Sequence, residues 1–162
     1  MSEDKGREIP DIREGTVIDH IPSHATTKVM EILNLDGHNY VISMGNNLES
    51  NKMGKKGIIK VGGKFITEEE ANKITIIAPT ATVSIIKNFK VDKKMRLKLP
   101  KIIDKIIKCK NPNCITNVQN IETRFNVIKE EPLTIKCEYC ERLMEADRSC
   151  TLDFVYSRAA TV

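Results

Sequence analysis

Branched apolar residues alternate with polar ones in several short segments of the first 91 residues, which is the pattern of half-buried β-strands. The first of these segments is TVIDHI, at residues 16–21. Three further strands are predicted, with the sequences HNYVISMG at residues 38–45, GIIKV at residues 57–61 and ATVSIIKNFKV at residues 81–91. Residues 46–56 are rich in Asn, Gly and Lys, and we expect them to form a loop between the second and third strands.

Two helices are predicted between these strands. The first has Ser23 as its N-terminal cap, ends at residues 36–37, and repeats apolar residues at spacings of three and four, namely Ala25, Val29, Ile32 and Leu33. The second follows Thr67, which forms the T-x-x-E spacing of a capping box with Glu70, and covers EEEANKI at residues 68–74. The order β-α-β-β-α-β predicts an α+β fold of the ferredoxin-like type, with both helices on one face of an antiparallel sheet.

A change in composition near residue 100 divides the chain of 162 residues into two predicted domains, residues 1–100 and residues 101–162. Residues 97–100 are expected to form the hinge between them. The second part contains all five cysteines and is expected to be a small, β-rich domain built around four of them. A chain of this length buries a core without needing disulfides.

The overall composition is that of a globular protein, with 30% charged and 40% hydrophobic residues. No apolar segment is long enough to cross a membrane, and the first ten residues, MSEDKGREIP, carry charges of both signs where a signal peptide needs an apolar core. We therefore expect a cytoplasmic protein that does not contact a membrane. Aromatic residues make up 4% of the chain and Trp is absent, which disfavours a base-stacking surface for single-stranded nucleic acid.

Four cysteines have the spacing of a metal site. Cys109 and Cys114 form a C-x4-C pair, and Cys137 and Cys140 form a C-x2-C pair. Four thiolates complete a tetrahedral zinc site and leave no position for water, so the spacing predicts one structural, non-catalytic Zn²⁺. Two disulfides, unrelated buried thiols or redox catalysis by CEYC are the alternatives, and a reducing compartment disfavours disulfides. Cys150 lies beyond the last ligand, and we expect it to be a free thiol.

Basic residues gather in two runs. Residues 52–64 contain five lysines and no acid, and residues 87–98 contain six basic residues against Asp92 alone. Each run alone fits a solvated protein surface, whereas two runs in one domain favour the binding of an anion such as a polyphosphate, which needs several cationic donors. Asp19 and His20 form a polar pair on the first predicted strand, either as partly exposed side chains or as ligand contacts.

Six motifs, read in order, resemble the regulatory chain of aspartate carbamoyltransferase, the first committed enzyme of pyrimidine biosynthesis. They are GTVIDHIP at 15–22, MGKKGIIKV at 53–61, APTATVSIIKN at 78–88, LPKIID at 99–104, CKNPNCITN at 109–117 and CEYC at 137–140. The resemblance implies a non-catalytic subunit. Its N-terminal allosteric domain would bind ATP, CTP or UTP and pair with a second copy, and its C-terminal zinc domain would dock on the catalytic chain. Three such dimers would bridge two catalytic trimers.

The resemblance also implies roles for individual residues of the allosteric domain. Asp19 and Lys60 would contact the ribose, and Lys94 and His20 would hold the phosphates. Lys56 would face a second nucleotide or a metal-bound phosphate. The pocket would be lined by Ile12, Val17, Ile86 and Val91.

The resemblance implies further contacts with the base and with the catalytic chain, and this sequence differs from the family at two positions. The backbone at Ile12 and Phe89 would read the exocyclic amino group of the base. Ser84 stands where the family more often has Asn, and Phe89 stands where it more often has Tyr. In the zinc domain, Asn111 and Asn113 lie between the first two ligands and would face the catalytic chain.

A nucleic-acid-binding zinc-ribbon protein is the competing interpretation of the same lysines and cysteines. Residues 101–162 contain ten Lys and Arg against nine Asp and Glu, a formal charge of +1. Four thiolates and one Zn²⁺ contribute −2, so the charge of this part becomes −1. A nucleic-acid-binding protein is expected to be basic around its zinc, which disfavours this interpretation.

Overall fold

The computed structural model describes residues 8–35 and 38–146. The chain divides into two compact units at the link between Lys98 and Leu99. Within the described residues, no helix has the length and apolar character needed to span a membrane. Each unit has its own sheet and its own buried core, and the two are described separately below.

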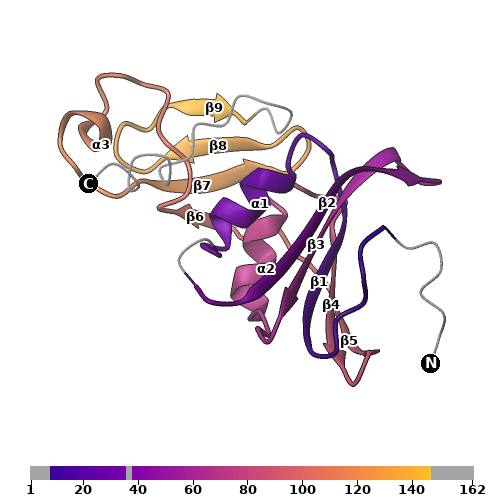
Figure 1. Cartoon of the computed structure of the whole chain (residues 1–162). Helices are drawn as coiled ribbons and strands as arrows, with labels where there is room; N and C mark the ends of the chain where they lie inside the picture. The colour runs from indigo at the N-terminus through magenta and orange to yellow at the C-terminus, as the bar shows by residue number, and fades with distance from the viewer. Residues whose placement is uncertain (1–7, 36–37, 147–162) are drawn as a thin grey trace. The chain divides into compact units, whose positions relative to one another are not determined.

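The first unit is a five-stranded sheet with two helices. In chain order its elements are β1 (Gly15–Ile21), α1 (Thr26–Ile32), β2 (Val41–Ser50), β3 (Gly54–Gly62), α2 (Glu68–Ile74), β4 (Thr82–Lys87) and β5 (Lys90–Met95). The strand order is β2-β3-β1-β4-β5, and all neighbours are antiparallel. Figure 1 shows α1 and α2 on the same face of this sheet. The predicted α+β class and mostly antiparallel sheet are confirmed.

The core of this unit lies between the sheet and the helices. Successive residues of a strand point to opposite faces, so every second residue of β1 and β3 is directed at the helices. Ile18 and Ile59 are directly opposite each other on these strands, and both are fully buried. Val29 of α1 and Ile74 of α2 are also fully buried. No helix of the residues described covers the opposite face of the sheet.

Gly57 on β3 allows α1 to approach the sheet. A Cβ atom built there would lie 1.9 Å from the Thr26 hydroxyl, at the first residue of α1. That hydroxyl donates a hydrogen bond of 2.9 Å to the side-chain oxygen of Asn46 on β2. The missing side chain at position 57 therefore lets the start of α1 pack directly on β3.

The predicted loop over residues 46–56 is wrong, because β2 and β3 extend into a long hairpin. Glu49 pairs with Lys55 and Ser50 with Gly54, so the turn covers residues 51–53 alone. A register shift follows Gly45, where Asn47 has a left-handed backbone with φ of 56°. Hairpin arms that extend beyond the core carry polar residues on both faces, and apolar alternation does not reveal them.

The predicted strand over residues 81–91 is also a hairpin, formed by β4 and β5. Asn88 and Phe89 both have positive φ, 55° and 65°, as the two-residue turns of twisted hairpins require. Lysines occupy much of β5, so this strand gives no apolar signal.

One predicted helix cap is wrong and the other is confirmed. Residues 22–25 form a turn closed by the Ala25 N–H, which donates to the Pro22 carbonyl at 2.8 Å. Ala25, and not Ser23, therefore stands at the N-cap of α1. At α2, the Glu70 N–H donates to the Thr67 hydroxyl and the Glu70 carboxylate accepts from the Thr67 N–H, which is the predicted capping box.

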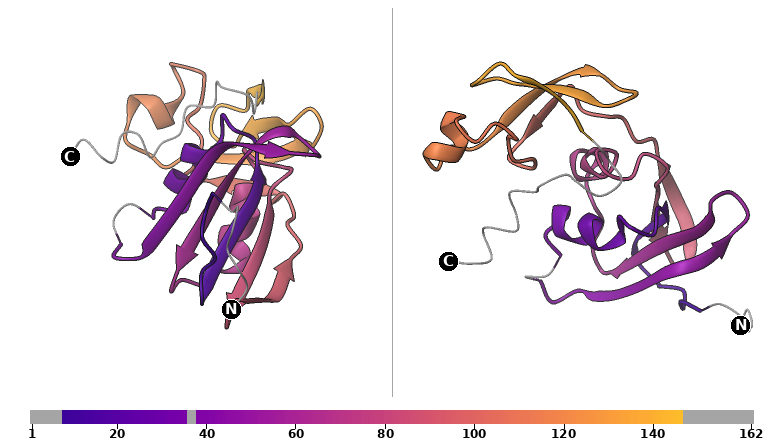
Figure 2. Two further views of the ribbon diagram at one scale, coloured as in Figure 1. Left: turned by 45° about the vertical axis from the view of Figure 1, so that its right-hand side comes forward. Right: turned by 90° about the horizontal axis from the view of Figure 1, so that it is seen from above.

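The second unit has a four-stranded antiparallel sheet in the order β6-β7-β8-β9 (Figure 2). Its elements are β6 (Ile102–Asp104), α3 (Ile115–Val118), β7 (Arg124–Lys129), β8 (Thr134–Cys137) and β9 (Leu143–Glu145). Its core is small and is built from Ile103, Ile106, Ile107, Phe125, Leu133 and Ile135. So small a core needs a further source of stability.

Candidate metal centre and anion-binding pocket

The four cysteines predicted to bind a metal come together at one point of the second unit. Their sulfur atoms all lie within 4.8 Å of one another. The Cys109 and Cys140 sulfurs are 3.8 Å apart, and the Cys114 and Cys137 sulfurs are 3.7 Å apart. Zinc–sulfur bonds of about 2.3 Å at tetrahedral angles place sulfurs about 3.8 Å apart. The cluster therefore fits a zinc ion in both donor type and spacing.

Local backbone structure positions each ligand. Cys114 is the residue that immediately precedes α3, and Cys137 is the last residue of β8. Cys140 lies in the turn after β8, where the Glu141 N–H donates to the Cys137 carbonyl at 2.9 Å. The Asn117 side-chain amide donates to the carbonyls of Cys109, at 2.8 Å, and Asn111, at 2.7 Å. Asn117 thereby closes the loop that contains the first two ligands.

The protein environment shifts the pKa values of the individual thiols in different directions. Burial raises the pKa of Cys109 to about 12 and also raises the pKa of Cys137. Burial acts in the same direction on Cys140, but hydrogen bonds from the Arg142 N–H and the Asn111 side chain outweigh it and lower its pKa to about 7. Buried thiolates therefore need a positive charge between them, which a divalent metal supplies.

The two asparagines expected at the partner interface differ in their exposure to solvent. Asn113 is exposed. Asn111 is half-buried, and its side-chain oxygen accepts a hydrogen bond of 3.1 Å from the Asn113 N–H. Asn111 therefore shapes the metal-binding loop, while the Asn113 side chain is available at the surface. Cys150 lies outside the described residues.

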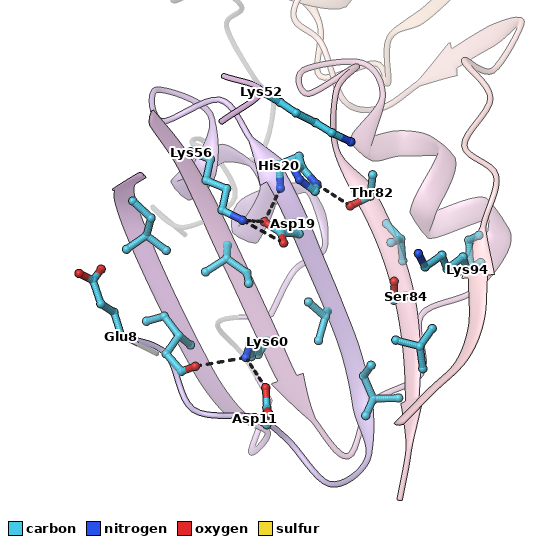
Figure 3. A pocket seen from close by; sticks show the side chains of 18 of the residues that line it. Glu8, Asp11, Asp19, His20, Lys52, Lys56, Lys60, Thr82, Ser84 and Lys94 are labelled. Carbon is cyan, nitrogen blue, oxygen red and sulfur yellow. Dashed lines mark hydrogen bonds and ion pairs between the residues drawn. The ribbon is translucent and has the colours of Figure 1, made fainter. Parts of the chain in front are cut away.

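A large pocket lies on the first unit, and residues of all five strands line it (Figure 3). Its volume is about 1150 Å³. Ten of the eleven residues expected to bind nucleotide line it, namely Val17, Asp19, His20, Lys56, Lys60, Ser84, Ile86, Phe89, Val91 and Lys94. Ile12 lies instead at a neighbouring depression, with Arg13, Glu14 and Gly62.

Strand register explains why residues so far apart in the sequence share this pocket. Val17 is directly opposite Lys60 on one side and Ser84 on the other, and Ser84 is directly opposite Lys94. Directly opposed residues of antiparallel strands point to the same face. Ile18, the next residue along β1, points into the core, so this row lies on the face without helices.

An irregularity in β1 sets the direction of the Asp19 and His20 side chains. The pairing of β1 with β3 shifts register between Ile18 and Ile21, and His20 has φ of 56°. Such bulges redirect side chains. The Asp19 carboxylate accepts from the His20 N–H at 2.6 Å and pairs with the Lys56 ammonium group at 2.9 Å. The His20 ring nitrogen Nδ1 lies 3.0 Å from the Thr82 hydroxyl (Figure 3).

The four lysines of the pocket fall into two classes. Lys56 pairs with Asp19, and the buried Lys60 pairs with Asp11. Lys52 and Lys94 are exposed, and neither has a hydrogen-bond or ion-pair partner among the residues that the structure describes. These two cations are therefore free to accept an anion from outside.

Sequence reasoning missed half of the residues that line the pocket. They are Glu8, Ile9, Asp11, Leu48, Glu49, Lys52, Ile58, Thr82, Val83 and Met95. Lys52 belongs to the first lysine run, which is a signal that was available. The segment around Asp11 precedes the first predicted strand, and no periodicity marks it as part of a site.

Comparison with protein families matches both units. The model of the aspartate carbamoyltransferase regulatory chain allosteric domain matches residues 7–98, and the model of its metal binding domain matches residues 101–149. The chain belongs to the aspartate carbamoyltransferase regulatory chain family. Because the family is that of the regulatory and not the catalytic chain, the expectation of a non-catalytic subunit is confirmed. The zinc-ribbon alternative is not favoured.

Individual relatives in this family cover most of the chain. The aspartate carbamoyltransferase regulatory chain of Pyrococcus horikoshii is 51% identical over 140 residues, which are 84% of this chain and 91% of the relative. That of Thermococcus sibiricus is 53% identical over 134 residues, 83% of this chain and 89% of the relative. That of Thermoplasma acidophilum is 43% identical over 143 residues, 87% of this chain and 95% of the relative.

Proposed function

We propose that the first domain, residues 1–100, binds ATP, CTP or UTP in the pocket of Figure 3, and that the zinc domain, residues 101–162, docks on a catalytic chain of aspartate carbamoyltransferase. Nucleotide binding then controls the first committed step of pyrimidine biosynthesis. The observation that carries this proposal is the row of opposed residues from Lys60 to Lys94, which joins two lysine runs at one open pocket. We also propose a cytoplasmic location, because a cluster of four reduced cysteines suits a reducing compartment.

The free cations of the pocket suit a polyphosphate. A triphosphate is strongly hydrated, and several cationic donors must replace its water. Lys94 and Lys52 offer two ammonium groups that are unpaired among the described residues, and the His20 ring lines the same pocket (Figure 3). The Lys56 ammonium group already pairs with Asp19. We therefore assign Lys56 to a second nucleotide or to a metal-bound phosphate.

The apolar part of the pocket suits a base and a ribose. Val17, Ile86 and Val91 provide its apolar surface. The Phe89 N–H donates to the Arg13 carbonyl at 3.0 Å, which brings the β4–β5 turn beside the segment that contains Ile12. Both backbone segments proposed to read the base therefore lie next to each other, although the Ile12 side chain lies outside the main pocket.

For the second domain we propose one structural Zn²⁺ per chain, held by Cys109, Cys114, Cys137 and Cys140. Four thiolates use all positions of a tetrahedral ion, so the metal stabilises the fold and does no chemistry. Next to the ligands, Ile115, Val118 and Tyr139 expose 43%, 69% and 47% of their surface. We propose that these exposed residues, together with Asn113, contact the protein partner.

The two edges of the five-stranded sheet differ, and this favours pairing of two copies through β2. On β5, Lys90, Lys93 and Lys94 protect the edge with charge. On β2, Val41 and Met44 expose 76% and 43% of their surface. A second copy that paired with β2 would cover these side chains and the unpaired backbone groups of the edge.

Calorimetric titration of the purified chain tests nucleotide binding. We expect ATP and CTP to bind without being hydrolysed, and we expect the chain to co-purify with a carbamoyltransferase catalytic chain. If millimolar triphosphate gives no binding heat while the chain binds DNA or RNA tightly, the allosteric role is wrong. Replacement Asn113→Ala is expected to weaken assembly with the catalytic chain at unchanged zinc content.

A further inference from the structure

The ammonium group of Lys60 is held by the segment that precedes β1. It donates to the Ile9 carbonyl at 3.2 Å, to the Pro10 carbonyl at 3.0 Å and to the Asp11 carboxylate at 3.2 Å. The Lys60 side chain is 8% exposed, whereas that of Asp11 is 38% exposed. Figure 3 shows Lys60 and Asp11 facing each other in the pocket.

An ammonium group has three N–H donors and accepts no hydrogen bonds. The three acceptors from residues 9–11 therefore satisfy Lys60 completely. A nucleotide that contacts Lys60 must replace one of them. The two carbonyls belong to the backbone, whereas the Asp11 carboxylate is at the end of a partly exposed side chain and is readily hydrated when it moves away.

We propose that Asp11 competes with the nucleotide for Lys60 and thereby sets the affinity of the pocket. In the free chain the carboxylate occupies the position that a ribose hydroxyl takes in the complex, and its charge opposes the approach of an anionic ligand. Nucleotide binding moves the carboxylate from Lys60 into water. This inference rests on the proposed function, because it takes the ligand to be a nucleoside triphosphate.

The competition has an unusual consequence, because removing a polar side chain from the pocket is expected to strengthen binding. We expect Asp11→Ala to raise the affinity for ATP and CTP at least about fivefold, the lower end of typical coupling between two ligands. Asp11→Asn removes the charge but keeps an acceptor, so its affinity is expected to lie between those of the wild type and Asp11→Ala. Both affinities are measured by calorimetric titration of the full, zinc-loaded chain.

Glu8→Gln is the matched control for charge alone. Glu8 lines the same pocket and precedes the same segment, and no contact between it and Lys60 is found among the described residues. We expect its effect to be smaller than that of Asp11→Ala and to vanish at high salt, because exposed charges are screened. The effect of Asp11→Ala is expected to persist at high salt.

A double-mutant cycle with Lys60→Met separates competition from other causes. When Lys60 is absent, Asp11→Ala should raise the affinity no more than Glu8→Gln does. A gain that is equal to that of Glu8→Gln in the wild-type background, or that persists undiminished without Lys60, would overturn the inference. An unchanged or weaker affinity of a folded Asp11→Ala chain would also overturn it. If Asp11→Ala does not fold, the same comparisons are made with Asp11→Asn. Absence of nucleotide binding to the wild-type chain would instead overturn the proposed function itself.

Discussion

The metal centre and the pocket are built in opposite ways. All four metal ligands lie within residues 109–140, on loops whose local structure directs each sulfur to one point. The pocket collects side chains from residues 8–95 by means of strand register. The first site is closed by four thiolates and suits a permanent ion. The second is open, contains two lysines that are unpaired in the part of the chain that the structure describes, and suits a ligand that binds and leaves.

This difference explains how ligand loss should act on the two domains. A closed thiolate site contributes its binding free energy to folding, whereas a reversible ligand shifts an equilibrium between states that are already folded. Loss of the metal should therefore unfold a domain, whereas changes in the pocket should alter nucleotide affinity in a folded chain.

Loss of zinc is expected to have the largest effect. Metal binding and folding are coupled by about 10–16 kcal/mol in small zinc peptides, so Cys114→Ser or a chelator should unfold the second domain and leave nucleotide binding by the first intact. A low pH should also release zinc from the second domain. Because burial raises the pKa of Cys109 to about 12, protons compete with the metal, and zinc affinity should fall as the pH falls.

Zinc content and circular dichroism, measured on the reduced chain from pH 8 downward, check this prediction. Cys150→Ser is the control, and it should leave the zinc content unchanged. A fully folded, reduced chain without metal would show that the cluster is not a metal site.

Replacement of Lys94 is expected to have the next largest effect. Lys94→Ala removes a free ammonium group from the pocket and should weaken ATP and CTP alike by about 1.5–3 kcal/mol, the range for charge-assisted hydrogen bonds. Lys60→Ala should also change the ratio of the two affinities, because its proposed contact is with ribose and base. Lys87→Ala is the control, since Lys87 pairs with Asp92 and neither residue lines the pocket. Equal losses in the Lys94 and Lys87 variants would exclude Lys94 as a phosphate ligand.

Asn117→Ala tests how the metal loop is held. The variant loses the two amide hydrogen bonds to the carbonyls of Cys109 and Asn111, and we expect a loss of about 1–3 kcal/mol in zinc affinity. Competition with a chromophoric chelator measures it. Asn120→Ala, at an exposed position nearby, should change nothing. An Asn117→Ala chain with wild-type zinc affinity would mean that the ligands alone determine the loop.

Phe89→Tyr is expected to have the smallest effect. The Phe89 side chain is 62% exposed, and base recognition at this turn is proposed to use the backbone. The added hydroxyl should change nucleotide affinity by less than about 0.5 kcal/mol, as for most surface substitutions. A larger gain for one nucleotide, measured by the same titration, would show that a side chain at this position takes part in selectivity.

The comparison of the two sites also explains which features the sequence predicts and which it does not. The clustering of the four cysteines and the α2 capping box were predicted correctly, because each cysteine pair and the capping box depend on residues a few positions apart. The hairpin from Asn46 to Lys56 and the Lys-rich strand β5 were missed, because polar strands outside a core show no apolar periodicity. The contact of Asp11 with Lys60 joins residues 49 positions apart, and the sequence contains no local sign of it.

The central claim is that this chain transmits nucleotide binding to a catalytic chain, and reconstitution tests it most directly. The zinc-loaded chain is combined with an aspartate carbamoyltransferase catalytic chain, and the rate of aspartate carbamoylation is measured with and without saturating CTP or ATP. The account predicts that at least one nucleotide changes the rate, and that Lys94→Ala shifts this response to higher nucleotide concentration. A rate that no nucleotide alters, in a complex that has assembled fully and binds nucleotide, would contradict the account.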